Sequence, residues 1–183
     1  EIEKISHDIK KENKHLIDGF GLERINFFIN KPLKEKIKLK KISFEDIDLM
    51  FNWVNDALVR KNSFMRKKIK YSDHKKWFEK KIFSNKSLIL KLLLNNIPIG
   101  QIRYDKKSNF YEIDYSIDEA FRNYGFGRII IKKSIKKFFK KKTIIRADVK
   151  QVNKQSIKIF KSLKFQEIES SSIKKRFEIL SSN

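Results

Sequence analysis

Residues 122–127 read Arg122-Asn123-Tyr124-Gly125-Phe126-Gly127, and they join a strand-like segment to a helix-like segment. Residues 110–117 before them alternate in the period of two that is typical of a strand, and residues 127–141 after them favour a helix. Two glycines two residues apart allow a tight turn and a close approach of the backbone to a ligand. A helix that starts there offers unpaired amide N–H groups and the positive end of its dipole. The stretch therefore predicts a phosphate or pyrophosphate site, while an ordinary strand–turn–helix junction stays the alternative.

The same six residues resemble the coenzyme-binding segment of the GNAT superfamily of N-acetyltransferases, whose pattern is Arg/Gln-x-x-Gly-x-Gly/Ala. Arg122, Gly125 and Gly127 occupy its three defining positions. A P-loop is excluded because no Lys-Ser/Thr follows the second glycine, and a dinucleotide fold would need three glycines and a later acidic residue. The resemblance implies an α+β fold with a mixed central sheet, which is splayed at the coenzyme site and carries helices on both faces. It also implies acetyl-CoA as the co-substrate, without a metal.

The predicted order of elements extends this resemblance over residues 37–180. Ser43 suits the N-cap of the first helix, with Asp46 three residues later, and Ser72 suits the N-cap of the second. We expect strands at 37–42, 87–94, 97–104, 110–117, 143–149, 165–169 and 173–180, and helices at 45–55, 73–83, 127–141 and 154–163. The second and third strands form a hairpin across Asn95-Asn96.

The composition is that of an ordinary folded domain of 183 residues, 40% of which are hydrophobic. The absence of cysteine excludes disulfides, thiolate metal sites and a cysteine nucleophile. No apolar run approaches the roughly 20 residues of a membrane span, and no signal-peptide pattern opens the chain. We therefore expect a cytoplasmic protein without a membrane span. The chain begins at Glu1 without Met, from which we expect it to be a piece of a longer protein.

The formal net charge of +22 suggests nucleic-acid binding at first sight. However, lysine far outnumbers arginine, and the joint abundance of Ile, Asn, Lys and Phe is typical of AT-rich coding. The lysines are scattered among carboxylates, except for a dense cluster at Lys132-Lys133, Lys136-Lys137 and Lys140-Lys141-Lys142. A basic rim of this kind attracts a multiply charged coenzyme or nucleotide. We therefore expect a small-molecule partner rather than nucleic acid.

Residues 1–33 predict a helical extension, with Ile2, Ile5 and Ile9 among charges and Gly19 as a helix stop. Residues 17–25 resemble the end of the sugar-nucleotide hydrolases of the pseudaminic-acid pathway. This resemblance implies the remnant of an upstream UDP-sugar hydrolase, fused to or associated with an acetyltransferase domain at residues 34–183. A helical extension without a function of its own is the equal alternative.

In the GNAT superfamily, acetyl-CoA lies between the splayed central strands. The resemblance implies that its pantetheine pairs with the backbone of Tyr115, Ser116 and Ile117. The pyrophosphate is expected on the turn, which consists of Arg122, Asn123, Tyr124, Gly125, Phe126, Gly127 and Arg128. Asn153 begins a segment similar to the superfamily's Asn-x-x-Ala/Ser-x-x-x-Tyr-x-x-x-Gly-Phe, which implies a helix cap, a coenzyme contact or both. In that segment Phe160 and Lys164 stand where the superfamily often has Tyr and Gly.

Direct attack of an amine on the thioester needs a base within hydrogen-bond reach and no covalent intermediate. Glu112 and Asp114, on the strand before the turn, are candidates, and so is Asp148 near the end of the next strand. Each of them also suits a solvated or salt-bridged carboxylate. Phe160 cannot donate a proton to the departing thiolate. Water or the hydroxyl of Tyr115 or Tyr124 takes that role, or coenzyme A leaves as the thiolate.

A set of residues resembles the acceptor side of pseudaminic-acid-type sugar-nucleotide N-acetyltransferases: residues 53–56 and 59–64, with Ile69, Tyr71, Ser72, His74, Trp77 and Phe78. Arg60 suits a diphosphate as a fork of donors, and His74 suits a phosphate contact or a base. Asn55 belongs to the same set, and Trp53 or Phe64 suits stacking on uracil. Core packing is the alternative for the aromatic residues.

The resemblance therefore implies an acetyl-CoA-dependent N-acetyltransferase whose acceptor is the amine of a UDP-4-amino-4,6-dideoxy sugar. Val54 departs from the pattern, because this group often has Arg at that position. Two rival functions stay open. One is a protein N-terminal or lysine acetyltransferase of the same fold, and the other is a non-enzymatic basic module that binds nucleic acid.

Overall fold

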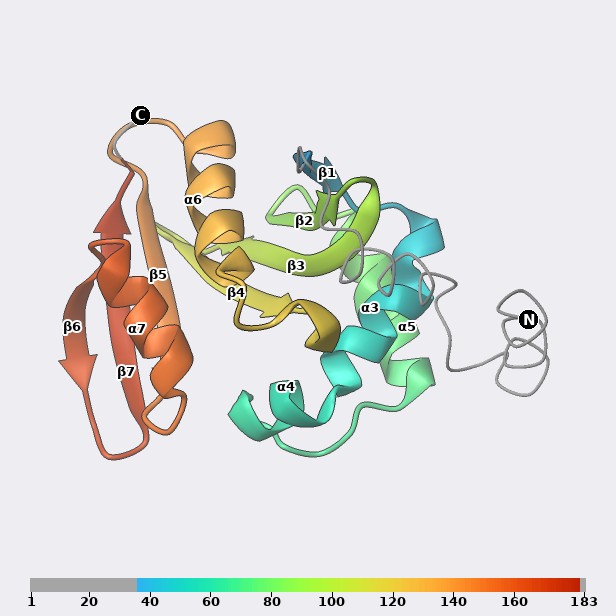
Figure 1. Ribbon diagram of the computed structural model, residues 1–183, viewed down its shortest axis with the longest axis horizontal. Helices are drawn as coiled ribbons and strands as arrows, with labels where there is room; N and C mark the ends of the chain where they lie inside the picture. The colour runs from blue at the N-terminus through green and yellow to red at the C-terminus, as the bar shows by residue number, and fades with distance from the viewer. Residues whose placement is uncertain (1–35, 182–183) are drawn as a thin grey trace.

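A computed structural model describes residues 36–181 of the chain, and these form one mixed sheet of seven strands with helices on both faces (Figure 1). The strand order is β1-β2-β3-β4-β5-β7-β6. The expected α+β fold is therefore confirmed. The predictions for residues 1–33, the helical extension and the hydrolase remnant, lie outside the described residues.

The sheet consists of two arms that meet at β4 (Tyr111–Ile117) and β5 (Ile144–Lys150). Within each arm, neighbouring strands are antiparallel. The arms are joined by a parallel pairing of only two residue pairs, Tyr111 with Ile145 and Glu112 with Arg146. Beyond these pairs β4 and β5 diverge, which is the predicted splay of the sheet. The other strands are β1 (Ile37–Lys41), β2 (Ser87–Leu94), β3 (Ile97–Lys106), β6 (Gln166–Ser170) and β7 (Lys174–Leu180).

Alternate side chains of β2 show which helices cover which face. Leu90 and Leu92 belong to the main core cluster together with Ile130 of α6, whereas Ile89 packs with Trp53 of α3 and Phe78 of α5. Because neighbouring residues of a strand point to opposite faces, α6 lies on one face and α3 and α5 lie on the other. The helices are η1 (Phe44–Asp46), α3 (Ile47–Asn55), α4 (Ala57–Asn62), α5 (Tyr71–Ile82), η2 (Glu119–Phe121), α6 (Phe126–Phe138) and α7 (Lys154–Ser162).

Local chemistry explains several element ends. Asn95 and Asn96 have φ values of 50° and 71°, which a two-residue hairpin turn requires. The backbone N–H of Ser43 donates to the Asp46 carboxylate at 2.8 Å, at the start of the first helical segment. The predicted cap at Ser72 is wrong, because the His74 N–H already donates to the Lys70 carbonyl and α5 therefore begins at Tyr71.

The short helix α4 was not predicted from the sequence. Its six residues are too few to show a helical period, so only its cap could have indicated it. Asp56 is that cap, and its Oδ1 accepts from the Val59 N–H at 2.9 Å. No helix within residues 36–181 is both long and apolar enough to cross a membrane.

Candidate functional site

A cavity of about 1450 Å³ lies where β4 and β5 diverge. Its walls come from α4 and the loop after it, the start of α5, β4, the turn before α6, the end of β5, and α7. The residues predicted for the site all line this cavity, with the exception of Trp53, Asn55 and Tyr124. The splay thus brings the predicted coenzyme segments and part of the predicted acceptor segment to one space.

The turn before α6 has the geometry of an anion-binding site. Asn123 and Gly125 have φ values of 68° and 84°, and Gly125 is the N-cap of α6. Gly125 has no side chain to cap the first amide groups, and the first turn of α6 contains no acidic residue. The positive end of the helix therefore borders the cavity, where it suits a pyrophosphate group.

The two glycines of the turn have different roles. A Cβ at Gly127 would lie 3.0 Å from Ile159 Cδ1 and 3.1 Å from a ring carbon of Tyr115, so glycine lets α6 approach β4 and α7 closely. At Gly125, by contrast, no heavy atom within the described residues lies within 4 Å of such a Cβ. Open space therefore borders the turn at Gly125.

The Arg122 side chain is engaged within the protein. Its Nε donates to the Ile117 carbonyl at 3.1 Å, and a terminal nitrogen donates to the Asp56 carboxylate at 2.6 Å. Asp56 in turn caps α4. Arg122 therefore links α4 to the turn before α6, which we call the coenzyme turn (residues 122–128) after its predicted role. A direct contact of the Arg122 guanidinium with the coenzyme stays a prediction.

Two asparagines stabilise α7 and the turn. Asn153 is the N-cap of α7, and its Oδ1 accepts from the Ser156 N–H at 3.1 Å. Gln155 Nε2 donates to Asn123 Oδ1 at 2.9 Å, so the first turn of α7 holds a residue of the coenzyme turn. The helix-cap role expected for Asn153 is thus present.

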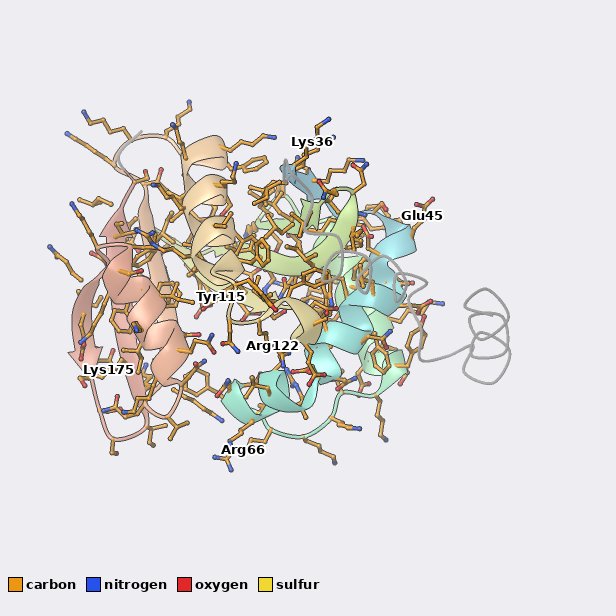
Figure 2. The ribbon with its side chains drawn as sticks, viewed as in Figure 1. Lys36, Glu45, Arg66, Tyr115, Arg122 and Lys175 are labelled. Atoms are coloured by element: carbon orange, nitrogen blue, oxygen red, sulfur yellow. The ribbon has the colours of Figure 1, made fainter. Side chains whose placement is uncertain are left out.

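Phe160 has no hydroxyl, but the hydroxyl of Tyr115 lies near it. Tyr115 projects from β4 toward α7, and its hydroxyl lies 3.0 Å from Ser156 Oγ (Figure 2). Burial raises the pKa of Tyr115 to about 12, so its phenol keeps its proton at neutral pH. Phe160 is 2% exposed, stacks on Phe177 with ring centroids 5.7 Å apart, and meets the Tyr115 ring edge-on. Tyr124 is 57% exposed and does not line the cavity.

Asp148 is held within the C-terminal arm. Arg176 donates to its two carboxylate oxygens at 2.6 and 2.8 Å, and Lys174 donates at 3.2 Å. Burial alone would raise the pKa of Asp148, but these hydrogen bonds outweigh it and lower the pKa. A carboxylate with a lowered pKa is a poor base, so the structure argues against the catalytic role expected of Asp148.

The two carboxylates of β4 are more available. Glu112 pairs with Lys107 at 3.0 Å and its side chain is 42% exposed, whereas Asp114 forms a longer ion pair with Arg103, at 3.5 Å, and its side chain is 56% exposed. Of the three candidate carboxylates, Asp114 is therefore the most accessible. Within residues 36–181, no group of three or more His, Asp or Glu side chains could hold a metal ion.

His74 lies in the wall of the cavity as a buried, neutral ring. It is 2% exposed and packs against Phe51, Trp77 and Phe78. Its Nε2 lies 3.1 Å from the Ile47 carbonyl and therefore carries the proton, because a carbonyl only accepts. Burial lowers the pKa of His74 despite this hydrogen bond. A neutral ring offers no charge to a phosphate, so the expected phosphate contact is not supported, and a role as base stays a prediction.

Two residues expected to bind the acceptor stabilise the fold instead. Trp53 is 6% exposed, and its Nε1 donates to the Asp118 carboxylate at 2.9 Å. Asn55 Nδ2 donates to the Ile69 carbonyl at 3.0 Å, and its Oδ1 accepts from the Ile69 N–H at 2.8 Å. Neither residue lines the cavity. Core packing explains Trp53, and Asn55 attaches the loop after α4 to α3.

Arg60 and Phe64 both line the cavity, and their contact with an acceptor stays a prediction. Arg60 donates to the Met65 carbonyl at 3.3 Å and to Ser63 Oγ at 3.0 Å, while its buried Nε has no partner within the described residues. Burial lowers the pKa of Arg60, against the opposing effect of the Asp114 charge. Phe64 lines the cavity and is 51% exposed, so its ring is accessible to a ligand.

Lys150 is a cavity residue that the sequence analysis missed. It ends β5, is only 8% exposed, and its Nζ donates to the Lys61 carbonyl at 3.1 Å. No carboxylate within residues 36–181 forms an ion pair with it. Burial lowers the pKa of Lys150, and the nearby charge of Arg66 lowers it further. A lysine at the end of a buried strand can be recognised in the sequence as a candidate site residue. Its contact with Lys61, 89 residues earlier, cannot be read from the sequence.

Comparison with known proteins identifies the family. Residues 36–166 match the family model described as an acetyltransferase (GNAT) domain. No curated protein matches the chain significantly.

Several solved structures resemble the chain. Spermidine N-acetyltransferase from Vibrio cholerae, in complex with CoA and spermine, has a TM-score of 0.69 and 16% identity, over 79% of this chain and 95% of that chain. The putative acetyltransferase yncA from Salmonella typhimurium, with its cofactor acetyl-CoA, has a TM-score of 0.66 and 14% identity, over 81% and 95%. The N-acetyltransferase PseH from Campylobacter jejuni has a TM-score of 0.59 and 19% identity, over 80% and 99%.

At these identities the solved structures show a shared fold and leave the acceptor open. The family model is more specific, because it covers most of the chain and includes the turn before α6, both diverging strands and all of α7. The chain therefore belongs to the GNAT family of acetyltransferases and is an N-acetyltransferase.

Proposed function

We propose that this enzyme transfers the acetyl group of acetyl-CoA to the free amine of a UDP-4-amino-4,6-dideoxy sugar. Three features of the cavity support an anionic nucleotide as the acceptor: a buried cation, an excess of basic residues, and an accessible aromatic ring. The cation lies at the end of β5 and the ring in the loop after α4, and these segments together with α4 form the proposed acceptor end of the cavity, whereas the basic residues line the cavity as a whole.

The observation that carries the proposal is Lys150, a cavity residue that is 8% exposed and has no carboxylate partner within residues 36–181. Burial of a charge without an ionic partner costs free energy, which an anionic ligand would recover. Within the described part of the chain its single hydrogen bond is to the Lys61 carbonyl, and its neighbour Arg66 carries the same charge. Arg60, with its unpartnered Nε, lines the same cavity. A diphosphate supplies the negatively charged partner that Lys150 and Arg60 lack within residues 36–181.

The charge of the whole cavity lining also favours an anionic acceptor. Within the described part of the chain, nine lysine and arginine residues line the cavity, against four aspartate and glutamate residues. Such an excess attracts an anionic acceptor and repels a polyamine. Phe64 offers an exposed ring on which a uracil base can stack. The contact between Lys150 and Lys61 bridges β5 and α4 beside the cavity.

Each part of the cavity has its own role in the proposed acetyl transfer. Acetyl-CoA supplies an activated thioester, the backbone of 115–117 pairs with its pantetheine, and the turn from Asn123 to Arg128 binds its pyrophosphate. Asp114 takes the proton of the attacking amine, directly or through one water. Arg60 and Lys150 hold the diphosphate, and this places the amine against the thioester. Orientation of this kind can lower the barrier by about 7 kcal/mol or more.

The experiment is a thiol-release assay with acetyl-CoA and three acceptors: the UDP-amino sugar, spermidine, and peptides with free N-termini. We expect turnover with the nucleotide sugar. Lys150→Gln should raise its KM at least tenfold and leave the KM of acetyl-CoA almost unchanged. Lys132→Gln is the matched control, because Lys132 is exposed on α6 and does not line the cavity.

Turnover of peptides or spermidine without turnover of the sugar would refute the acceptor and leave the acetyltransferase assignment intact. Equal KM values for the nucleotide sugar in native enzyme and Lys150→Gln would show that Lys150 does not bind the acceptor.

A further inference from the structure

We propose that the Tyr115 hydroxyl, positioned by Ser156, is the hydrogen-bond donor that stabilises the departing thiolate of coenzyme A. The inference deepens the proposed function. It rests on acetyl transfer from the coenzyme and does not depend on the sugar acceptor.

The position of Ser156 on α7 is the first argument. Ser156 and Phe160 are four residues apart on one helix, so they lie on the same face one turn from each other, and both line the cavity. Phe160 has no hydroxyl, and its ring packs against Phe165 and Phe177. The hydroxyl pair of Tyr115 and Ser156 lies one helical turn from this ring, so it supplies the polar group in this part of the cavity wall.

Tyr115 reaches this place from the opposite arm of the sheet. Its backbone belongs to β4, its ring packs edge-on against Phe160 with centroids 5.9 Å apart, and its hydroxyl meets Ser156 at 3.0 Å. The side chain thus lies between the two diverging arms. Asn153 caps α7 through the Ser156 N–H, so the backbone that carries the partner hydroxyl is fixed.

The other phenols are elsewhere. All five tyrosines lie within residues 36–181, and Tyr115 alone among them lines the cavity. Tyr71 donates to Asp48, and Tyr104 is buried against Ser134. Tyr111 packs on Phe139, and Tyr124 is largely exposed. A phenol that contacts the reacting sulfur must therefore be Tyr115.

The acidity of Tyr115 decides whether it transfers a proton to the thiolate or only donates a hydrogen bond to it. A phenol with a pKa of about 12 is a weaker acid than a thiol of about 8.5, so the proton stays on Tyr115. As the amine nitrogen forms the new bond to carbon, the carbon–sulfur bond breaks and its electron pair remains on sulfur. The Tyr115 O–H donates to that charge, Ser156 donates to the Tyr115 oxygen, and the amine proton leaves through the base. Water protonates the thiolate after release.

A direct test measures the thiol of bound coenzyme A, independently of turnover. The ultraviolet absorbance of the thiolate is titrated with pH on the complex of the enzyme with coenzyme A, and the S-methyl analogue supplies the baseline. In native enzyme we expect the pKa of the bound thiol to lie at least one unit below that of free coenzyme A, because a hydrogen bond to the charged form favours it. Tyr115→Phe should bring it back toward the free value.

Turnover supplies the second readout. Tyr115→Phe should lower kcat by about tenfold to a thousandfold, as the loss of a hydrogen-bond donor to a developing anion does. The double variant Tyr115→Phe, Phe160→Tyr should recover part of this loss, because it returns a phenol to the neighbouring position. Tyr111→Phe is the matched control on the same strand, since its hydroxyl lies outside the cavity, and it should change neither readout.

Melting temperatures of all variants separate chemistry from folding. A bound-thiol pKa and a kcat that are the same in native enzyme and in folded Tyr115→Phe would overturn the inference. Failure of the native chain to bind coenzyme A would instead refute the coenzyme site, so the two kinds of failure are distinguishable.

Discussion

At the residue scale, the coenzyme turn depends on the absence of a side chain at Gly127. A Cβ there would lie 3.0 Å from Ile159 Cδ1 and 3.1 Å from a ring carbon of Tyr115, which is closer than nearly all real Cβ contacts. The residue therefore sets the distance between α6, α7 and β4. Because Tyr115 is one of its neighbours, the same close packing also holds the hydroxyl pair of Tyr115 and Ser156.

We predict that Gly127→Val lowers the affinity for acetyl-CoA at least tenfold and lowers stability by about 1–3 kcal/mol through overpacking. Gly127→Ala should have smaller effects of the same sign, because the neighbouring side chains need to move only a few tenths of an ångström. Calorimetric titration with acetyl-CoA and urea unfolding measure the two effects. A folded Val variant that binds as tightly as the native protein would contradict the close approach.

At the scale of elements, α4 connects the coenzyme turn to the acceptor end. Asp56 caps this helix and receives a hydrogen bond from Arg122, and both side chains of this ion pair are 17% exposed. The same helix carries Arg60 and offers the Lys61 carbonyl to Lys150. Its placement therefore decides where the cations of the acceptor end lie.

Two substitutions at Asp56 separate the cap from the ion pair. Asp56→Asn keeps an oxygen acceptor for the Val59 N–H and removes the charge, whereas Asp56→Ala removes both. We expect both variants to raise the KM of the acceptor, and Asp56→Ala to lose a further ~1 kcal/mol of stability for the cap. Steady-state kinetics and urea unfolding measure these changes. Native-like values in Asp56→Asn would show that the ion pair with Arg122 contributes nothing.

At the scale of the whole molecule, the C-terminal arm depends on ion pairs that join its strands. Asp148 of β5 binds Arg176 and Lys174 of β7, and these two residues also contact Glu169 of β6. The lowered pKa of Asp148 means that the folded state favours its charged form. Its stabilising effect is therefore present above the ordinary carboxyl pKa of about 3.9 and is lost as the pH falls through the lower folded value.

We predict that Asp148→Asn is less stable than the native protein at neutral pH, and that the difference shrinks as the pH falls below about 4. Urea unfolding at a series of pH values measures the difference. A gap that stays constant down to the acid limit would show that the charge of Asp148 does not stabilise the arm. The acetyl-CoA affinity of the folded variant provides a check that the coenzyme turn is unaffected.

The order of elements and the turn at residues 122–127 were predictable because both depend on patterns of neighbouring residues. Alternation of apolar residues indicated the strands, and the glycines of residues 122–127 indicated a turn that needs positive φ and close approach. The cap at Asn153 and the hairpin at Asn95-Asn96 depend on neighbours within a few residues. Such contacts form within a short segment of chain, so the sequence shows them directly.

The chemistry of the cavity was decided by tertiary structure, because its contacts join segments far apart in the chain. Lys150 meets Lys61, Tyr115 meets Ser156, and Arg122 meets Asp56, and none of these pairs shares a local pattern. The aromatic ring of Trp53 suits stacking on a base, but packing between α3 and the sheet buries it. The sequence by itself determined the family, the arrangement of the sheet and the glycine-containing turn before α6. Only the folded chain decided which cations lack a partner and which hydroxyl lies beside Phe160, because burial and pairing depend on what the two diverging arms bring together.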